Sequence, residues 1–190
     1  MLKAKYINKV TEINKIYLED IVTEGDVVVD ATMGNGYDTV YLAKKVGDSG
    51  KVYAFDVQEE ALKSTSKKIS KEGLTNIELI LDGHQNMDKY VSGGVSCIVF
   101  NLGYLPRAKH QIITKADTTI LAIKKGLDLL KPNGVMSIAI YSGHEGGMEE
   151  KEAVYKFAQS LDQNYFNVLC TKFINQINNP PELLLIEKKG

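Results

Sequence analysis

Short apolar runs alternate with longer amphipathic segments along the whole chain. Each apolar run has the length and the residue types of a β-strand. Such strands are expected at residues 26–30, 51–56, 77–81, 95–100, 134–141, 165–172 and 182–187. The amphipathic segments place apolar residues at helical spacing. They predict helices at residues 9–22, 37–46, 58–72, 115–131 and 148–161.

This alternation is typical of βαβ units, in which helices join parallel strands. We therefore expect one α/β domain over residues 1–190, with a doubly wound, seven-stranded, mainly parallel Rossmann-like sheet. The helix within residues 1–22 should pack on that sheet. The segment NQINNPP between the last two strands is too short for a crossover helix. These strands should therefore form an antiparallel C-terminal hairpin with Pro180 and Pro181 in its turn.

The composition is that of an ordinary soluble protein, with 25% charged and 44% hydrophobic residues. No apolar run is long enough to span a bilayer, and the first residues lack the pattern of a signal peptide, so a cytoplasmic protein is expected. Cys97 and Cys170 lie in apolar runs, where a thiol is expected to pack as a small buried hydrophobe. Three histidines and two cysteines without ligand spacing predict no metal site.

A glycine-rich motif follows the first expected strand, in VVVDATMGNGYDT. Gly34 and Gly36 allow a sharp turn and let a ligand approach bare amides at the positive end of a helix. Asp30 would repel the phosphates of a dinucleotide, whereas a ligand with an ammonium and a sulfonium would be attracted. Methyltransferases with this motif have a glycine where this chain has Thr32. A plain strand-to-helix turn is the alternative interpretation.

Acids also follow the second and third expected strands. Asp56 ends the run KVYAFD, where a carboxylate can accept both hydroxyls of a ribose, as in NAD and S-adenosylmethionine sites alike. Asp82 lies in LDGH at the same edge of the sheet. It could accept from an adenine amino group, or it could be a solvated turn aspartate. The two acids thus indicate an adenosine ligand without choosing the cofactor.

The segment after the fourth expected strand, NLGYLP, separates methyl transfer from hydride transfer. Class I methyltransferases that modify amino nitrogens have an Asn or Asp here, followed by small residues and an aromatic. Asn101 and Tyr104 occupy the two ends of that pattern. Leu102 and Gly103 stand where the Asn-Pro-Pro-Tyr type of motif has prolines, so the match is partial.

Taken together, DATMGNGYDT, FDVQ, LDGHQNM, NLGYLP, YSGHEGG and NNPPELLLIEK resemble the YtqB-like rRNA methylase family, which includes the MnmM-type tRNA methyltransferases. The resemblance covers nearly the whole chain. It implies a class I methyltransferase that uses S-adenosylmethionine and acts on RNA, tRNA before rRNA. The implied reaction is N-methylation of the 5-aminomethyl group of the tRNA wobble uridine to 5-methylaminomethyluridine.

The same resemblance implies roles for individual residues. The methionine end of the cofactor would be held by Asp30, Gly34, Asn35, Gly36, Asp38 and Thr39. The ribose would be held by Asp56 and Gln58, and the adenine side by Asp82 and His84. As catalytic residues, Asn101 and Tyr104 would face the methyl group and its acceptor.

Candidate RNA contacts follow the acceptor motif. The only arginine of the chain, Arg107, lies close to Lys109 and His110. An arginine can fork onto a phosphate or stack on a base, although a short basic run can also be a solvated loop. Tyr141 and His144 flank the glycine-rich segment after the fifth strand, which could close over a substrate.

Several alternatives stay open at this point. The formal net charge of −1 does not indicate a nucleic-acid binder, so an RNA partner would need a local patch. An rRNA methylase, a small-molecule methyltransferase, a noncatalytic RNA-binding module and an NAD-dependent oxidoreductase are the competing hypotheses. No membrane partner is expected, and the pattern leaves open whether the chain forms a homodimer.

Overall fold

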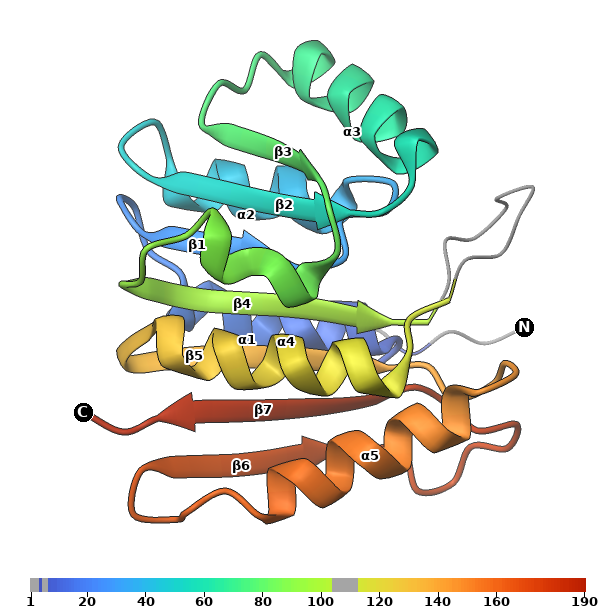
Figure 1. Ribbon diagram of the computed structural model, residues 1–190. Coiled ribbons are helices and arrows are strands. Elements are labelled where there is room, and N and C mark those ends of the chain that lie inside the picture. The colour runs from blue at the N-terminus through green and yellow to red at the C-terminus, as the bar shows by residue number, and fades with distance from the viewer. Residues whose placement is uncertain (1–3, 5–6, 104–112) are drawn as a thin grey trace.

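The computed structural model describes residue 4, residues 7–103 and residues 113–190. Its centre is a seven-stranded sheet in the order β3-β2-β1-β4-β5-β7-β6 (Figure 1). The strands are β1 (Val27–Asp30), β2 (Lys51–Asp56), β3 (Ile77–Leu81), β4 (Val95–Leu102), β5 (Leu130–Ile140), β6 (Phe166–Thr171) and β7 (Glu182–Lys188). Strands β1 to β5 pair in parallel, whereas β7 is antiparallel to both β5 and β6. The expected fold class and the C-terminal hairpin are therefore confirmed.

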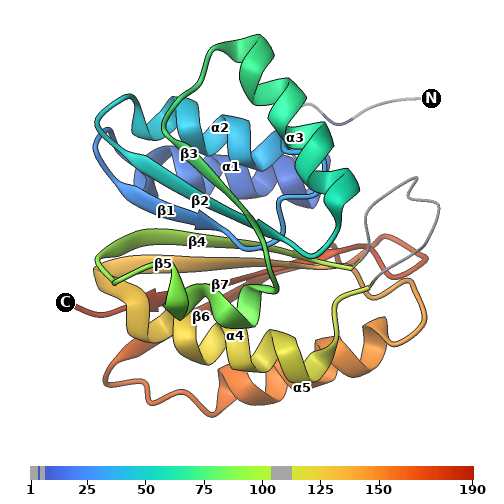
Figure 2. The ribbon, with the colours of Figure 1, turned by 45° about the horizontal axis from the view of Figure 1, so that its top comes forward.

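Helices cover both faces of this sheet, as Figure 2 shows: α1, α2 and α3 lie on one face, and η1, α4 and α5 on the other. Their bounds are α1 (Val10–Ile21), α2 (Tyr37–Val46), α3 (Glu59–Glu72), α4 (Ala116–Leu129) and α5 (Gly147–Gln159), with the 3₁₀ helix η1 at His84–Lys89. Helix α1 packs against β5 and β7. The short helix η1 was not predicted.

Side chains alternate between the two faces along the central strands, as the pleat of a strand requires. In β4, Cys97 and Val99 pack on the face of α1 and α2, whereas Ile98 and Phe100 pack on the face of α4. All four are fully buried. Burial of a valine, isoleucine or phenylalanine side chain such as these contributes about 1.5–3 kcal/mol. This core fixes the central strands and, with them, the loops at their ends.

The boundary between α4 and β5 differs from the expected one. The sequence predicted a helix to residue 131 and a strand from residue 134, but α4 ends at Leu129 and β5 begins at Leu130. The reason is Pro132, which disfavours the helical conformation in the residue before it. A register shift against β4 then accommodates residues 131–134 in the strand.

Both cysteines are free thiols. Cys97 is buried in β4, as expected, but Cys170 is only half-buried in β6, where its sulfur lies 2.9 Å from the hydroxyl of Tyr155. None of the helices within the described ranges combines the length and the apolar character needed to cross a membrane.

Candidate active site

The carboxyl ends of β1, β2 and β4 meet at one edge of the sheet. Asp30 and Asp56 are the last residues of β1 and β2, and Asn101 lies one residue before the end of β4. Strands β2 and β3 follow β1 outward on one side of the sheet, and β4 then pairs with β1 on its other side. In open α/β sheets such a topological switch point is where ligands bind.

Asp30 is completely buried beneath the loop that follows β1. Its carboxylate accepts the Thr39 hydroxyl at 2.6 Å and the Thr32 N–H at 3.2 Å. Burial and then the nearby charge of Asp38 raise the pKa of Asp30 to about 7, and its hydrogen bonds oppose that shift. The site therefore contains an acid that changes its charge near neutral pH.

The glycine loop is fixed against α3. Gly36 has a φ of 74°, and a Cβ atom there would come within 2.6 Å of Thr65 Oγ1. The Thr65 hydroxyl donates to the Gly34 carbonyl at 3.1 Å, and the Ser64 hydroxyl donates to Asn35 Oδ1 at 3.2 Å. The loop therefore has no room for a side chain at residue 36. Its backbone leads directly into the N-terminus of α2, where helical N–H groups favour a negatively charged ligand group.

Asp56 links this loop to the end of β2. Its carboxylate accepts the Gly34 N–H at 3.0 Å and the Gln58 N–H at 2.9 Å. Burial raises the pKa of Asp56, although these backbone bonds oppose the shift. A carboxylate has further lone pairs, so Asp56 can still accept hydroxyl donors. Val57, which is 52% exposed, adds an apolar surface directly beside it.

Asp82 and His84 lie in the turn after β3. Asp82 accepts hydrogen bonds from Gly83, Asn86 and Tyr90, and the bond from Asn86 contributes most to lowering its pKa. These bonds are those of a solvated turn aspartate, so an adenine contact stays a prediction. His84 is buried, and burial lowers its pKa to about 4.

Because His84 is neutral, its tautomer follows from its contacts. Its Nδ1 lies 3.3 Å from the Ala31 carbonyl, which can only accept, so Nδ1 carries the proton. Its Nε2 is then a buried acceptor without a hydrogen-bond partner among the described residues.

Asn101 is held from two sides. Its backbone N–H donates to Thr32 Oγ1 at 2.7 Å, and its side-chain Nδ2 donates to Asp38 Oδ2 at 2.8 Å. The carboxylate fixes the orientation of the amide, which leaves Oδ1 as the acceptor of this side chain. Thr32, which replaces a glycine of the motif, thus ties the loop after β1 to the end of β4. No sequence pattern indicated this contact, since Thr32 was interpreted only as a departure from the motif.

Two further predicted residues lie beside the end of β4. A Cβ atom at Gly103 would lie 3.4 Å from Tyr141 Cβ and 3.6 Å from His144 Nε2. The Tyr141 N–H donates to the Leu102 carbonyl at 3.2 Å. Burial, followed by the charge of Asp38, raises the pKa of Tyr141. Tyr141 and His144 are thus brought next to the segment that contains Asn101.

Four predicted residues cannot be placed in this way. Tyr104, Arg107, Lys109 and His110 lie outside the described residues. Their roles therefore stay predictions.

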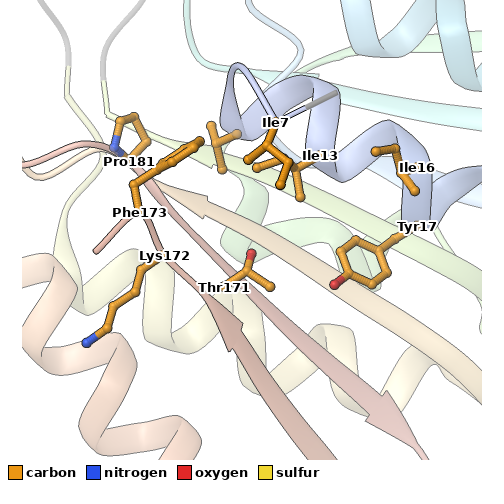
Figure 3. A pocket seen from close by; sticks show the side chains of 9 residues that line it. Ile7, Ile13, Ile16, Tyr17, Thr171, Lys172, Phe173 and Pro181 are labelled. Atoms are coloured by element: carbon orange, nitrogen blue, oxygen red, sulfur yellow. The ribbon is translucent and has the colours of Figure 1, made fainter. Parts of the chain in front are cut away.

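An apolar groove of about 260 Å³ lies between α1 and the connection from β6 to β7 (Figure 3). Ile7 and Ile13 on the side of α1 face Phe173 and Pro181 across it. Lys172 carries the only charge among the described residues that line this groove. The described lining contains no carboxylate, and neither Asp30 nor Asp56 belongs to it. The groove is therefore not the predicted cofactor site.

Comparisons with known families and sequences agree with this geometry. The family model "Putative rRNA methylase" matches residues 52–187, and the model "Protein-L-isoaspartate(D-aspartate) O-methyltransferase" matches residues 8–91. The chain is 37% identical over 194 residues to the "tRNA (mnm(5)s(2)U34)-methyltransferase, chloroplastic" of Arabidopsis thaliana. That match covers 95% of this chain and 70% of the relative.

Solved structures give the same result. A "putative rRNA-methylase" from Clostridium thermocellum has 46% sequence identity and a TM-score of 0.93, over 98% of this chain and 100% of the other. A "putative methyltransferase" from Streptococcus mutans, solved in complex with SAH, has 44% identity and a TM-score of 0.88, over 96% and 99% of the two chains.

Proposed function

Since the chain belongs to the rRNA methylase family and is an S-adenosylmethionine-dependent methyltransferase, we propose that its acceptor is tRNA. The proposed reaction is N-methylation of the 5-aminomethyl group on the wobble uridine, which gives 5-methylaminomethyluridine. Support for this acceptor comes from the Arabidopsis relative, which aligns with 95% of the chain. The structural observation that supports methylation of an amine is the anchored amide of Asn101 beside the glycine loop.

The residues at the carboxyl edge fit S-adenosylmethionine. Asp56 offers a carboxylate to the ribose hydroxyls, and Val57 offers an apolar surface to the adenine ring. The glycine loop and Asp30 would hold the methionine end, where the buried carboxylate favours a positively charged group. The same acid disfavours the phosphates of NAD, the cofactor of the competing oxidoreductase hypothesis.

The main task of the protein in this reaction is to align the acceptor amine with the methyl group. When bound, S-adenosylmethionine supplies a methyl group that its sulfonium already activates. The acceptor amine must be neutral to attack, and a dry site beside a positive charge lowers the pKa of an amine. Asn101 Oδ1 can accept an N–H of that amine and so direct its lone pair toward the methyl group. Under this proposal no dedicated base is needed, and the predicted role of Tyr104 is to stack on the base or to shape the pocket.

The test is methylation by the purified protein. It would be incubated with labelled S-adenosylmethionine and with bulk tRNA or rRNA from a strain that lacks its gene, and label would be located by nucleoside mass spectrometry. Label in 5-methylaminomethyluridine supports the proposal. Label in an rRNA nucleoside would replace tRNA by rRNA, whereas no label in RNA despite cofactor binding would favour a small-molecule acceptor. A protein that binds RNA but neither binds nor uses the cofactor would be a noncatalytic module.

An RNA substrate agrees with the expected cytoplasmic location. Under this proposal the RNA contacts lie around the end of β4, next to Tyr141 and His144. Whether the chain forms a homodimer stays open.

A further inference from the structure

Two hydrogen bonds join the point where the chain leaves β4 to the point where it approaches α4. The Thr114 N–H donates to the Gly103 carbonyl at 2.9 Å. The Gly103 N–H donates to the hydroxyl oxygen of Thr114 at 2.9 Å. Both polar groups of the Gly103 backbone are therefore held by one residue.

A buried carboxylate holds that threonine from the other side. The Thr114 hydroxyl donates to Glu150 Oε2 at 2.6 Å, and the Thr119 hydroxyl donates to Glu150 Oε1 at 2.6 Å. Glu150 lies in α5 and is only 2% exposed. Hydroxyl-to-carboxylate bonds of this length are stronger than neutral hydrogen bonds. Glu150 therefore fixes the direction of the Thr114 proton and leaves the oxygen lone pairs for the Gly103 N–H.

Gly103 lies where such a constraint affects the acceptor site. It follows Asn101 by two residues, and its φ of 151° is one that residues with a side chain rarely adopt. It also lies next to Tyr141 and His144, and Gly147 at the start of α5 is close to the same His144 ring. A shift of the Gly103 backbone would therefore move the groups that surround the acceptor.

We propose that Glu150 is a positioning residue of the acceptor site, which acts through Thr114 on the backbone of Gly103. This inference rests on the proposed function, because Asn101 is taken to orient the acceptor. Glu150 is buried and accepts from Thr114 and Thr119, so under this proposal it acts through its neighbours and not by contact with the acceptor or the cofactor. Its role is to hold the Gly103 backbone, two residues after Asn101, in position.

The test compares Thr114→Val with Thr119→Val. Both substitutions keep the shape of the side chain and remove one hydroxyl donor to Glu150, but only the first removes the acceptor of the Gly103 N–H. Thr114→Val should lower kcat for tRNA by about ten-fold or more, since misplaced reacting groups cost at least that much. Its affinity for SAH should stay unchanged. Thr119→Val should lower Tm and keep kcat, and Thr114→Ser should restore kcat because it keeps the hydroxyl.

Amide hydrogen exchange of Gly103 gives a readout that does not depend on turnover. Thr114→Val should speed the exchange of this amide, and Thr119→Val should not. If Thr114→Val does not fold, Glu150→Gln, which keeps the size of the side chain, should show the same fast exchange. Unchanged exchange in these variants, or an equal loss of kcat in Thr114→Val and Thr119→Val, would overturn the inference. If the wild type does not methylate tRNA, the proposed acceptor fails, whereas the exchange result still decides the link between Glu150 and Gly103.

Discussion

At the scale of single residues, Asp30 is completely buried, and a bound cofactor should shift it toward its ionised form. Its pKa is raised from 3.8 to about 7, chiefly by burial and then by Asp38. The ordinary pKa of an aspartate, 3.8, applies to the unfolded chain, and the pKa in the folded protein is higher. Asp30 therefore makes the ligand-free protein lose stability as the pH rises from about 4 to 7. A positive group bound nearby would favour the carboxylate form and lower this pKa.

Binding of S-adenosylmethionine near pH 7 should therefore release a proton from Asp30, and the affinity should rise with pH up to about 7 or 8. Calorimetry in buffers with different ionisation enthalpies measures this proton. Asp30→Asn, which cannot ionise, should bind more weakly above neutral pH and lose the pH dependence. Proton release that persists in Asp30→Asn would show that another group titrates.

Asn101 gives a second prediction at this scale. Asn101→Ala removes the oriented amide, so kcat for tRNA should fall by about 100-fold through loss of alignment, well beyond any change in cofactor affinity that follows from the lost bond to Asp38. Steady-state kinetics and calorimetry measure the two quantities. Asn14→Ala is the control, because it removes a buried side-chain hydrogen bond, donated by Ser137, in which no predicted site residue takes part. It should lower Tm and leave kcat unchanged. Full turnover of Asn101→Ala would exclude the proposed role.

At the scale of elements, the loop between β1 and α2 depends on close contact with α3. Gly36→Ala would place a methyl group 2.6 Å from Thr65 Oγ1, at a residue with a φ of 74°. Gly73 at the end of α3 is a matched control, since it has a φ of 68° and no atom within 4 Å of an added Cβ. Gly73→Ala should cost about 1–2 kcal/mol of stability from the backbone alone. Gly36→Ala should cost more and should also weaken SAH binding, as measured by denaturant unfolding and calorimetry.

The elements also show how far the sequence could predict this structure. Apolar runs predicted all seven strands. In the central strands the pattern follows from burial between two helical layers, whereas β6 at the edge is apolar although its Val168 and Leu169 are exposed. The helix η1 escaped prediction because one short 3₁₀ segment has no periodic face, and only His84 and Met87 in it are buried. Motifs located Asp30, Asp56 and Asn101 at one edge. The bond between Asn101 and Asp38, by contrast, joins residues far apart in the chain, and no local pattern specifies such a pair.

At the scale of the whole molecule, the net charge is too small to attract RNA, so any attraction must come from a local group of cations. Lysines and arginine number 23 against 24 acids. Several lysines are paired on the surface, including Lys44 with Glu72 and Lys45 with Glu19. Such pairs reduce the field that would attract a polyanion. An RNA substrate therefore requires unpaired cations near the acceptor site, and the sequence predicts them at Arg107 and Lys109.

The double variant Arg107→Ala/Lys109→Ala should therefore weaken tRNA binding and reduce its salt dependence. Each lost phosphate contact lowers the slope of log K against log salt by about 0.7 to 0.9, so two contacts give about 1.5. Lys67→Ala/Lys71→Ala removes the same charge from exposed positions of α3 and is the matched control. Fluorescence polarisation at several salt concentrations measures both slopes. An equal change in the two variants would mean that RNA responds to overall charge, and no change in either would identify the Arg107 segment as a solvated loop.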